Sequence, residues 1–215
     1  MKGLAIFDLD GTLINSIEDL ASSMNQALSE CGLPVHELFK YYTFVGDGAA
    51  KLITRAIPED KLSDNTIKKV REGFIRHYSE NYLDKTFIYD GAAELLERLK
   101  AKGYMLAVAS NKPDEFTSVI IERLFKSGSF DFVRGNILGT PHKPDPQIVF
   151  DIIKELEAEK ESCIFIGDSG VDVQTAHNAG IKAIGCLWGY RDRAELENAK
   201  ADYLAGHPLD ILKFL

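Results

Sequence analysis

Short runs of consecutive apolar residues recur along the chain, and most of them stop abruptly at a polar cluster. Runs of this length that are apolar at every position are typical of strands buried on both faces of a parallel sheet. We therefore predict strands near residues 4–7, 105–109, 130–133, 163–166 and 183–188, with an edge strand near 202–204.

The segment from residue 16 to residue 85 has a different spacing, with apolar residues every three or four positions. This is the spacing of one face of a helix. The first helix is predicted to follow Ser16 as its N-cap and to end at Gly32. Asp64 or Asn65 is predicted to cap a longer helix near residues 67–78. The helices after the first are expected near residues 37–42, 49–57 and 67–78.

From residue 86 onward the two patterns alternate, with helical spacing near residues 91–102, 114–125, 146–156, 171–179 and 194–199. Strands that alternate with helices indicate βαβ units and a parallel sheet. We therefore predict an α/β fold whose core is a doubly wound, Rossmann-like parallel sheet. Residues 1–15 and 86–215 would form this catalytic core, and residues 16–85 an inserted all-helical cap domain over the carboxyl edge of the sheet.

The composition narrows the possible partners. The chain has 215 residues, of which 45% are hydrophobic, and a formal charge of −8. An acidic balance argues against non-specific nucleic-acid binding, which needs clustered Lys and Arg. No apolar run is long enough to span a bilayer, and Asp8 and Asp10 interrupt the apolar N-terminal stretch, unlike a signal peptide. Three cysteines without metal spacing fit a reducing cytoplasm.

Two carboxylates, Asp8 and Asp10, follow the first apolar run and precede Gly11. Ligands bind at the carboxyl ends of strands in open α/β sheets, and alternate residues of an extended chain share a face. Two close carboxylates repel each other unless a cation such as Mg²⁺ lies between them. One could then attack phosphorus while the other handles the proton of the leaving group. The alternative is that the pair merely ends a strand and caps a turn.

A hydroxyl and an amide, from Ser110 and Asn111, stand at the end of the second long apolar run and are followed by Lys112. These groups, with backbone N–H groups at the start of a helix, suit phosphate oxygens. Taken alone, the same residues would form an ordinary turn.

A lysine enclosed by prolines, Lys143, stands in the run His142-Lys143-Pro144-Asp145-Pro146. Prolines restrict the backbone and so present the ammonium rigidly. Such an ammonium could neutralise a phosphate and an attacking carboxylate together. The alternative is a solvated surface charge.

A second carboxylate pair, Asp168 and Asp172, follows the apolar run at residues 163–166. Two carboxylates that straddle a turn can hold a metal ion directly or through water. An N-capped helix with acidic residues in its first turn would look the same. A second carboxylate pair after a second buried strand favours the metal site.

The stretch from Phe7 to Leu13 resembles the opening signature of the haloacid dehalogenase-like hydrolase superfamily, in its phosphatase branch. The resemblance implies Asp8 as nucleophile, Asp10 as general acid and base, and phosphate contacts from Ser110, Lys143, Asn111 and Leu9. It also implies Mg²⁺ held by Asp8, Asp168 and the backbone carbonyl of Asp10, with Asp172 in or beside the inner shell. Dehalogenases of this superfamily lack the second aspartate.

Two further stretches, residues 44–49 and 187–190, resemble those of bacterial phosphoglycolate phosphatases within this superfamily. The resemblance implies a small phosphorylated metabolite as the partner, with 2-phosphoglycolate as the candidate, and Gly46 as a substrate contact. Outside these stretches, Arg55 could meet the carboxylate of the substrate. A turn glycine and a solvated arginine are the alternative for these two residues.

Other functions remain open at this stage. A sugar phosphomutase of the β-phosphoglucomutase type, an inorganic pyrophosphatase and a catalytically silent phospho-ligand binding protein fit the same residues. The sequence leaves monomer and homodimer equally open.

Overall fold

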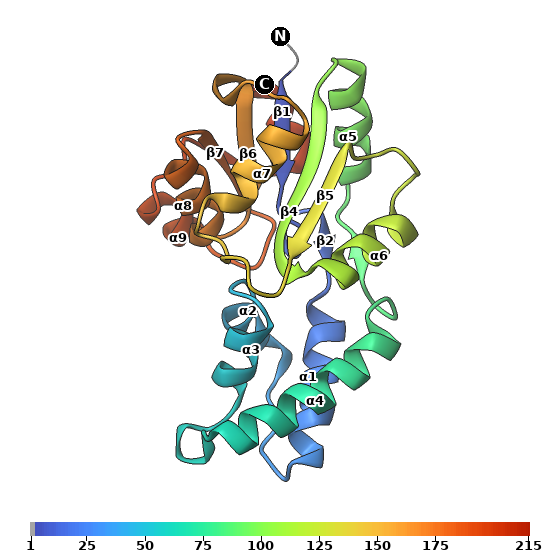
Figure 1. Cartoon of the computed structure of the whole chain (residues 1–215), viewed down its shortest axis with the longest axis vertical. Helices are drawn as coiled ribbons and strands as arrows, with labels where there is room; N and C mark the ends of the chain where they lie inside the picture. Colours follow the sequence, from blue (N-terminus) through green and yellow to red (C-terminus); the bar gives the residue numbers. More distant parts are fainter. Residues whose placement is uncertain (1–2) are drawn as a thin grey trace. The chain divides into compact units, whose positions relative to one another are not determined.

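A parallel sheet of six strands forms the core of the computed structural model, which describes residues 3–215. The sheet order is β5-β4-β1-β6-β7-β8, and every adjacent pair is parallel (Figure 1). The strands are β1 (Leu4–Phe7), β4 (Met105–Pro113), β5 (Phe132–Asn136), β6 (Cys163–Gly167), β7 (Lys182–Cys186) and β8 (Tyr203–Ala205). The predicted parallel α/β fold is therefore confirmed.

The strand order places a switch point beside the central strand β1. The chain moves outward from β1 through β4 to β5, and returns to the other side of β1 through β6, β7 and β8. In open α/β sheets, ligands bind outside the carboxyl ends of the strands at such a switch point. Residues that follow β1, β4 and β6 are thereby the first candidates for a site.

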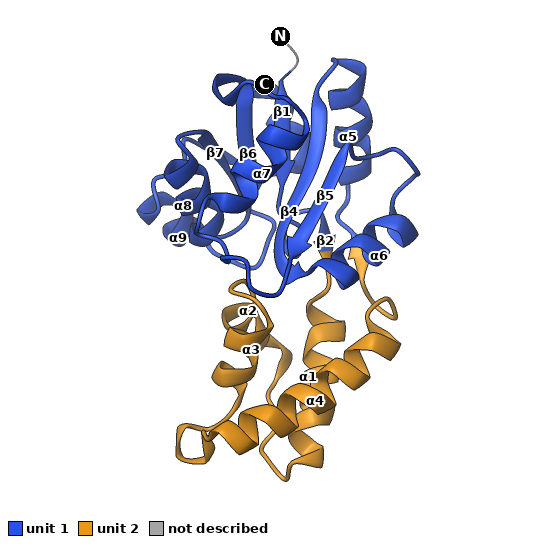
Figure 2. Ribbon diagram, viewed as in Figure 1, with its two compact units in different colours: residues 1–14, 88–215 blue, residues 15–87 orange. Residues whose placement is uncertain are grey.

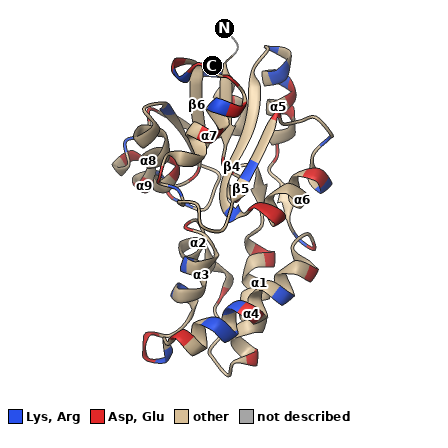
Figure 3. Cartoon of the chain, viewed as in Figure 1, with Lys and Arg blue, Asp and Glu red and all other residues tan. Residues whose placement is uncertain are grey.

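Five helices pack against this sheet: α5 (Ala92–Ala101), α6 (Asp114–Leu124), α7 (Gln147–Glu155), α8 (Gly170–Ala179) and α9 (Arg193–Asn198). The strands are apolar because helices cover them, and Leu4, Ile6 and Phe165 are at most 1% exposed. The described residues also form three short 3₁₀ helices, Glu59–Lys61, Lys160–Ser162 and Pro208–Lys213. Acidic and basic residues are interspersed along α5 (Figure 3).

The chain divides into two compact units, residues 1–14 with 88–215, and residues 15–87 (Figure 2). The second unit contains α1 (Ile17–Glu30), α2 (Leu38–Phe44), α3 (Ala49–Ala56) and α4 (Asp64–Asn81). Helix α1 packs against α4, where Gly73 allows a close approach: a Cβ at this glycine would lie 3.1 Å from the Cβ of Ala27. Among the described residues, no helix is long and apolar enough to cross a membrane.

The chain passes between the two units twice, at β2 (Ile14–Asn15) and β3 (Phe87–Ile88), which pair with each other. The sequence pattern did not predict these strands, because two residues are too few to show a period. In the helical unit, the buried carboxylate of Asp19 accepts hydrogen bonds from the backbone N–H groups of Lys85 and Thr86 and from the Thr86 hydroxyl.

Local predictions differ from the structure in several places, and the strand predicted near residues 130–133 spans Phe132–Asn136 instead. The cap of α4 is neither Asp64 nor Asn65 but Ser63, whose extended backbone lets its hydroxyl accept a hydrogen bond from the N–H of Thr66. Strand β4 does not stop at residue 109 but continues to Pro113, because β5 pairs with it as far as this residue. Residues 110–112 therefore stand on extended backbone rather than in a turn.

Candidate active site

Three carboxylates meet at the carboxyl ends of β1 and β6. These strands are neighbours in register, Phe7 beside Ile166, so Asp8 and Asp168 follow them at the same edge. The backbone N–H of Asp8 donates to the carbonyl of Ile166 at 2.9 Å. Asp172 joins them from the first turn of α8, and each of the three buried residues offers an oxygen within 4.8 Å of the others.

A buried lysine neutralises part of this cluster. Lys143 Nζ donates to Asp8 Oδ1 at 2.8 Å, to Asp172 Oδ1 at 2.7 Å and to the carbonyl of Ala109 at 2.9 Å. An ammonium has three protons, so these contacts satisfy it completely. Asn111 holds the lysine backbone, since its side chain accepts from the N–H of Lys143 at 2.8 Å and donates to its carbonyl at 3.2 Å.

A capping box fixes Asp172. Its Oδ2 accepts hydrogen bonds from the N–H of Ser169 at 3.1 Å and the Ser169 hydroxyl at 2.7 Å, which ties it to the N-terminus of α8. A Cβ at Gly167 would lie 2.3 Å from the Cβ of Asp172, so this strand end has no room for a side chain. The contacts with the start of α8 and with Lys143 together hold the carboxylate of Asp172 in one orientation.

The loop after β7 holds Asp168. The N–H of Tyr190 donates to Asp168 Oδ2 at 2.7 Å, and the hydroxyl of Thr12 lies 3.3 Å from Oδ1. The indole N–H of Trp188 donates to the carbonyl of Thr12 at 3.0 Å and so joins the two supports. A Cβ at Gly189 would lie 2.2 Å from the Cβ of Asp168.

These supporting roles of Thr12, Trp188 and Tyr190 were not predicted from the sequence. The segment from Leu187 to Tyr190 stood out only for its resemblance to relatives. Its position after a buried strand is the one signal that places it beside Asp168, because β7 is the neighbour of β6.

The cluster carries more negative than positive charge. Burial raises the pKa of Asp8 to about 7, with Lys143 acting against it and Asp172 adding to it. Burial also raises the pKa of Asp168 well above its ordinary value, and the charges of Asp172 and Asp8 add to this. Burial lowers the pKa of Lys143, but the carboxylates of Asp172 and Asp8 raise it further, to a net value above its ordinary one.

Three ionised carboxylates and one ammonium leave a charge of −2 at this place. A divalent cation with a preference for oxygen ligands matches both the charge and the donor atoms. The residues present therefore fit Mg²⁺.

A second buried lysine, Lys112, binds Asp10, the second carboxylate of the stretch that follows β1. Lys112 Nζ lies 2.9 Å from both side-chain oxygens of Asp10. Ser110, two residues before it on β4, is 2% exposed, and its hydroxyl accepts from the N–H of Lys112 at 3.2 Å. Leu9 is fully buried, and its carbonyl accepts from the N–H groups of Leu13 and Ile14.

The remaining two predicted site residues lie in the helical unit. Gly46 has a φ of +124°, a backbone conformation that favours glycine. Arg55 Nη2 lies 2.5 Å from Asp47 Oδ2, and its Nη1 donates to the carbonyl of Phe44 at 3.0 Å. Both contacts of Arg55 stay within this unit.

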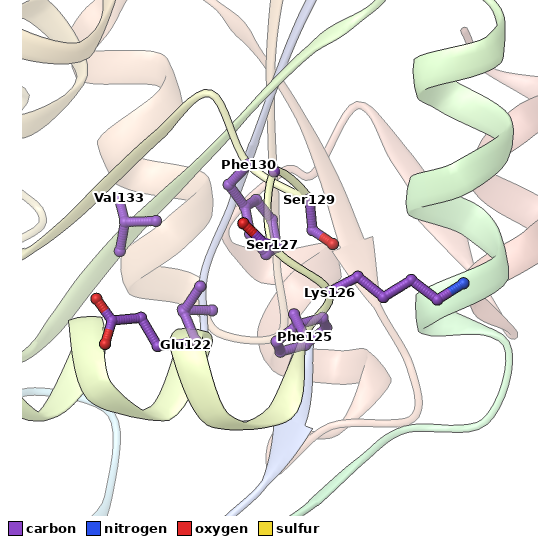
Figure 4. Close-up of a pocket in the computed structure, with 9 residues that line it drawn as sticks. Glu122, Phe125, Lys126, Ser127, Ser129, Phe130 and Val133 are labelled. Carbon is purple, nitrogen blue, oxygen red and sulfur yellow. The ribbon is translucent and has the colours of Figure 1, made fainter.

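A shallow pocket of about 190 Å³ lies elsewhere on the sheet unit, between the C-terminal half of α6 and the start of β5 (Figure 4). Its lining includes the rings of Phe125 and Phe130 and the side chains of Glu122 and Lys126. None of the predicted site residues lines this pocket, so it is separate from the carboxylate site.

Comparison with known proteins gives consistent matches over the whole chain. A model of the haloacid dehalogenase-like hydrolases matches residues 5–186. Phosphoglycolate phosphatase of Aquifex aeolicus is 34% identical over 210 residues, which cover 98% of this chain and 95% of that protein. That of Haemophilus influenzae strain 86-028NP is 34% identical over 204 residues, which cover 92% and 91%.

Solved structures agree with the sequence matches. The crystal structure of a predicted phosphoglycolate phosphatase from Haemophilus somnus has a TM-score of 0.92 and 32% identity, and the match covers 99% of this chain and 97% of that one. A crystal structure from Lactobacillus delbrueckii has a TM-score of 0.93 and 31% identity, with 100% and 98% covered.

Proposed function

The chain belongs to the haloacid dehalogenase-like hydrolase family, and from this premise we propose that it is a magnesium-dependent phosphomonoester hydrolase that works through an aspartyl-phosphate. The observation that carries the proposal is the buried cluster of Asp8, Asp168 and Asp172 around Lys143. It combines a nucleophilic carboxylate, a fixed ammonium and a place for a divalent cation.

Asp8 and Asp168, with the backbone carbonyl of Asp10, would hold Mg²⁺, and Asp172 would lie beside them. The ion supplies positive charge that reduces the repulsion between a phosphate dianion and an attacking carboxylate. In the protein alone, burial and the neighbouring charge of Asp172 already make Asp8 hard to ionise and raise its pKa to about 7.

In the first step, Asp8 attacks phosphorus in line, the ester P–O bond breaks, and Asp10 gives its proton to the leaving alkoxide. In the second step, a water molecule gives a proton to Asp10 and attacks phosphorus, and the bond between Asp8 and phosphorus breaks. The ammonium of Lys143, the hydroxyl of Ser110 and backbone N–H groups around Leu9 stabilise the charge on the phosphate oxygens.

For the substrate we propose 2-phosphoglycolate, because relatives that match nearly the whole chain carry the name phosphoglycolate phosphatase. The helical unit would act as the cap that selects the leaving group, and the guanidinium of Arg55 is the candidate partner of the substrate carboxylate. Arg55 would exchange its contact with Asp47 for this partner. We place the enzyme in the cytoplasm, which suits its three free cysteines.

The test is a screen of phosphate esters with Mg²⁺, read out as free phosphate. 2-Phosphoglycolate should be the best substrate, with glycolate released in equal amount, and a chelator should stop the reaction. Isomerisation of a hexose phosphate without phosphate release would indicate a mutase. Preference for pyrophosphate would indicate a pyrophosphatase, and no turnover of any ester, an aryl phosphate included, would leave only a binding protein.

The nucleophile is tested by Asp8→Asn, which should lower turnover by on the order of 10³-fold or more because the amide cannot form the acyl-phosphate. The matched control is Asp60→Asn, an exposed carboxylate of the helical unit, which should leave turnover unchanged. Substantial activity of a folded Asp8→Asn protein would refute the assignment.

A further inference from the structure

Two buried lysines serve different carboxylates of the site. Lys143 binds Asp8 and Asp172, whereas Lys112 binds Asp10 with its Nζ equally distant, 2.9 Å, from Oδ1 and Oδ2. The side chain of Lys112 is 4% exposed and that of Asp10 13%. Contact with both oxygens holds the end of the carboxyl group beside the ammonium.

Further contacts hold the backbone on each side of this ion pair. Asp10 starts a tight turn in which the N–H of Gly11 donates to the carbonyl of Ile14 at 2.9 Å. The carbonyl of Lys112 accepts from the Thr117 hydroxyl at 3.2 Å, and a Cβ at Gly135 on β5 would lie 2.7 Å from this carbonyl. The backbone of Lys112 is therefore held within the sheet, while its ammonium contacts the turn that follows β1.

The contact with Lys112 does not prevent the carboxyl group of Asp10 from transferring a proton. Each carboxyl oxygen has a second lone pair, so an oxygen that accepts from Lys112 can still bind a further proton or donor. A lysine in this position therefore orients the carboxyl group without blocking it.

We propose that Lys112 is a positioning residue for proton transfer: it holds the Asp10 carboxyl group in the orientation from which it serves both steps of the reaction. This inference rests on the proposed function, in which Asp10 gives a proton to the leaving alkoxide and later takes one from water. Lys112 acts through Asp10 and forms no bond to the substrate.

The test uses two substrates that differ in their need for a proton. Breaking the ester bond of 2-phosphoglycolate releases the alkoxide of glycolate, which must be protonated, whereas 4-nitrophenyl phosphate releases a stable phenolate. In Lys112→Met, which keeps the apolar stem, kcat for 2-phosphoglycolate should fall about 10- to 100-fold with KM little changed, a part of the 10²–10⁴ range of a full acid–base group.

With 4-nitrophenyl phosphate, the first turnover of Lys112→Met should keep its rate, since the leaving group needs no acid. Later turnovers should slow, because water still needs Asp10 as base. The aspartyl-phosphate should therefore accumulate, which rapid quenching and intact-protein mass measure directly. Lys112→Arg should restore most of the rate, and Lys126→Met, which removes an exposed lysine paired with Glu97, should leave both substrates unaffected.

A double variant separates positioning from a purely structural role. If Lys112 acts through Asp10, Lys112→Met should add almost nothing to the loss in Asp10→Asn. Independent, multiplicative losses would overturn the proposal. So would a raised KM with normal kcat, which would indicate a direct phosphate contact, or unchanged kinetics. If Lys112→Met does not fold, Lys112→Gln carries the same comparison with a smaller loss.

The failure of this inference differs from the failure of the proposed function. A wild-type protein that forms no aspartyl-phosphate with either substrate would refute the function itself. A wild-type protein that forms it, together with a Lys112→Met protein that shows the same kinetics, would refute only the role of Lys112.

Discussion

At the scale of single residues, Asp8 is a carboxyl group whose surroundings disfavour its ionised form. It is buried beside two other carboxylates, and the one ammonium in contact with it, that of Lys143, is shared with Asp172. Burial makes the ionised form costly, and a nucleophile must be ionised. The site therefore disfavours the ionised form of Asp8, the proposed nucleophile, and a bound cation would relieve this cost.

The stability of the metal-free protein should depend on pH through Asp8. The pKa of this carboxyl rises from an ordinary 3.8 to about 7 in the folded chain. Between these values the unfolded chain has lost a proton that the folded chain retains, so stability should fall as the pH rises through this window. Thermal unfolding with a chelator at several pH values measures this fall.

Asp8→Asn provides the control for this pH dependence, because the amide does not titrate. Its unfolding curve should depend less on pH between about 4 and 7 than that of the wild-type protein. Mg²⁺ should raise the melting temperature of the wild-type protein most at the upper end of the window. Equal pH dependence of the two proteins would contradict the role of burial at Asp8.

At the scale of elements, the start of α8 links helix stability to the site. Its capping box joins Ser169 to Asp172, and Asp172 in turn contacts Lys143. Sequence reasoning offered two interpretations of this segment, a helix cap and a metal site, as alternatives. In the structure the same carboxylate caps the helix with Oδ2 and binds the lysine with Oδ1, so the two interpretations do not exclude each other.

Ser169→Ala should therefore lower both stability and activity. Loss of the cap should reduce the free energy of unfolding by about 1 kcal/mol, and a freer Asp172 should lower kcat by misplacing Lys143. The matched control is Ser63→Ala at the start of α4, which removes a cap hydrogen bond of the same kind in the helical unit. Urea unfolding should show similar losses in the two variants, whereas only Ser169→Ala should lower kcat. Equal kcat values in both would refute the link.

At the scale of the whole molecule, the fold depends on contacts between chain segments that are far apart in sequence. The helical unit is inserted after residue 14 and the chain returns at residue 88. Asp19, 3% exposed, binds the returning segment at Lys85 and Thr86. Together with the pairing of β2 and β3, this carboxylate thus joins the two ends of the segment that forms the unit.

Asp19→Asn should destabilise the protein by about 2 kcal/mol, because the amide turns one donor group toward N–H groups that need acceptors. Urea unfolding measures the loss, and exposed Asp60→Asn is again the control. An unchanged free energy of unfolding would show that water replaces the lost acceptor.

The sequence by itself determined the class of the fold, because the spacing of apolar residues is a local property that separates strands from helices. It also selected Asp8, Asp168 and Asp172 as residues that follow buried strands, since parallel strands end at one edge. Only the tertiary structure decided the pairing of each side chain. Lys112 binds Asp10, 102 positions earlier, and Asn111 clamps Lys143, 32 positions later. The order and register of the strands determine which side chains meet, and the spacing of apolar residues along the chain does not indicate these pairs.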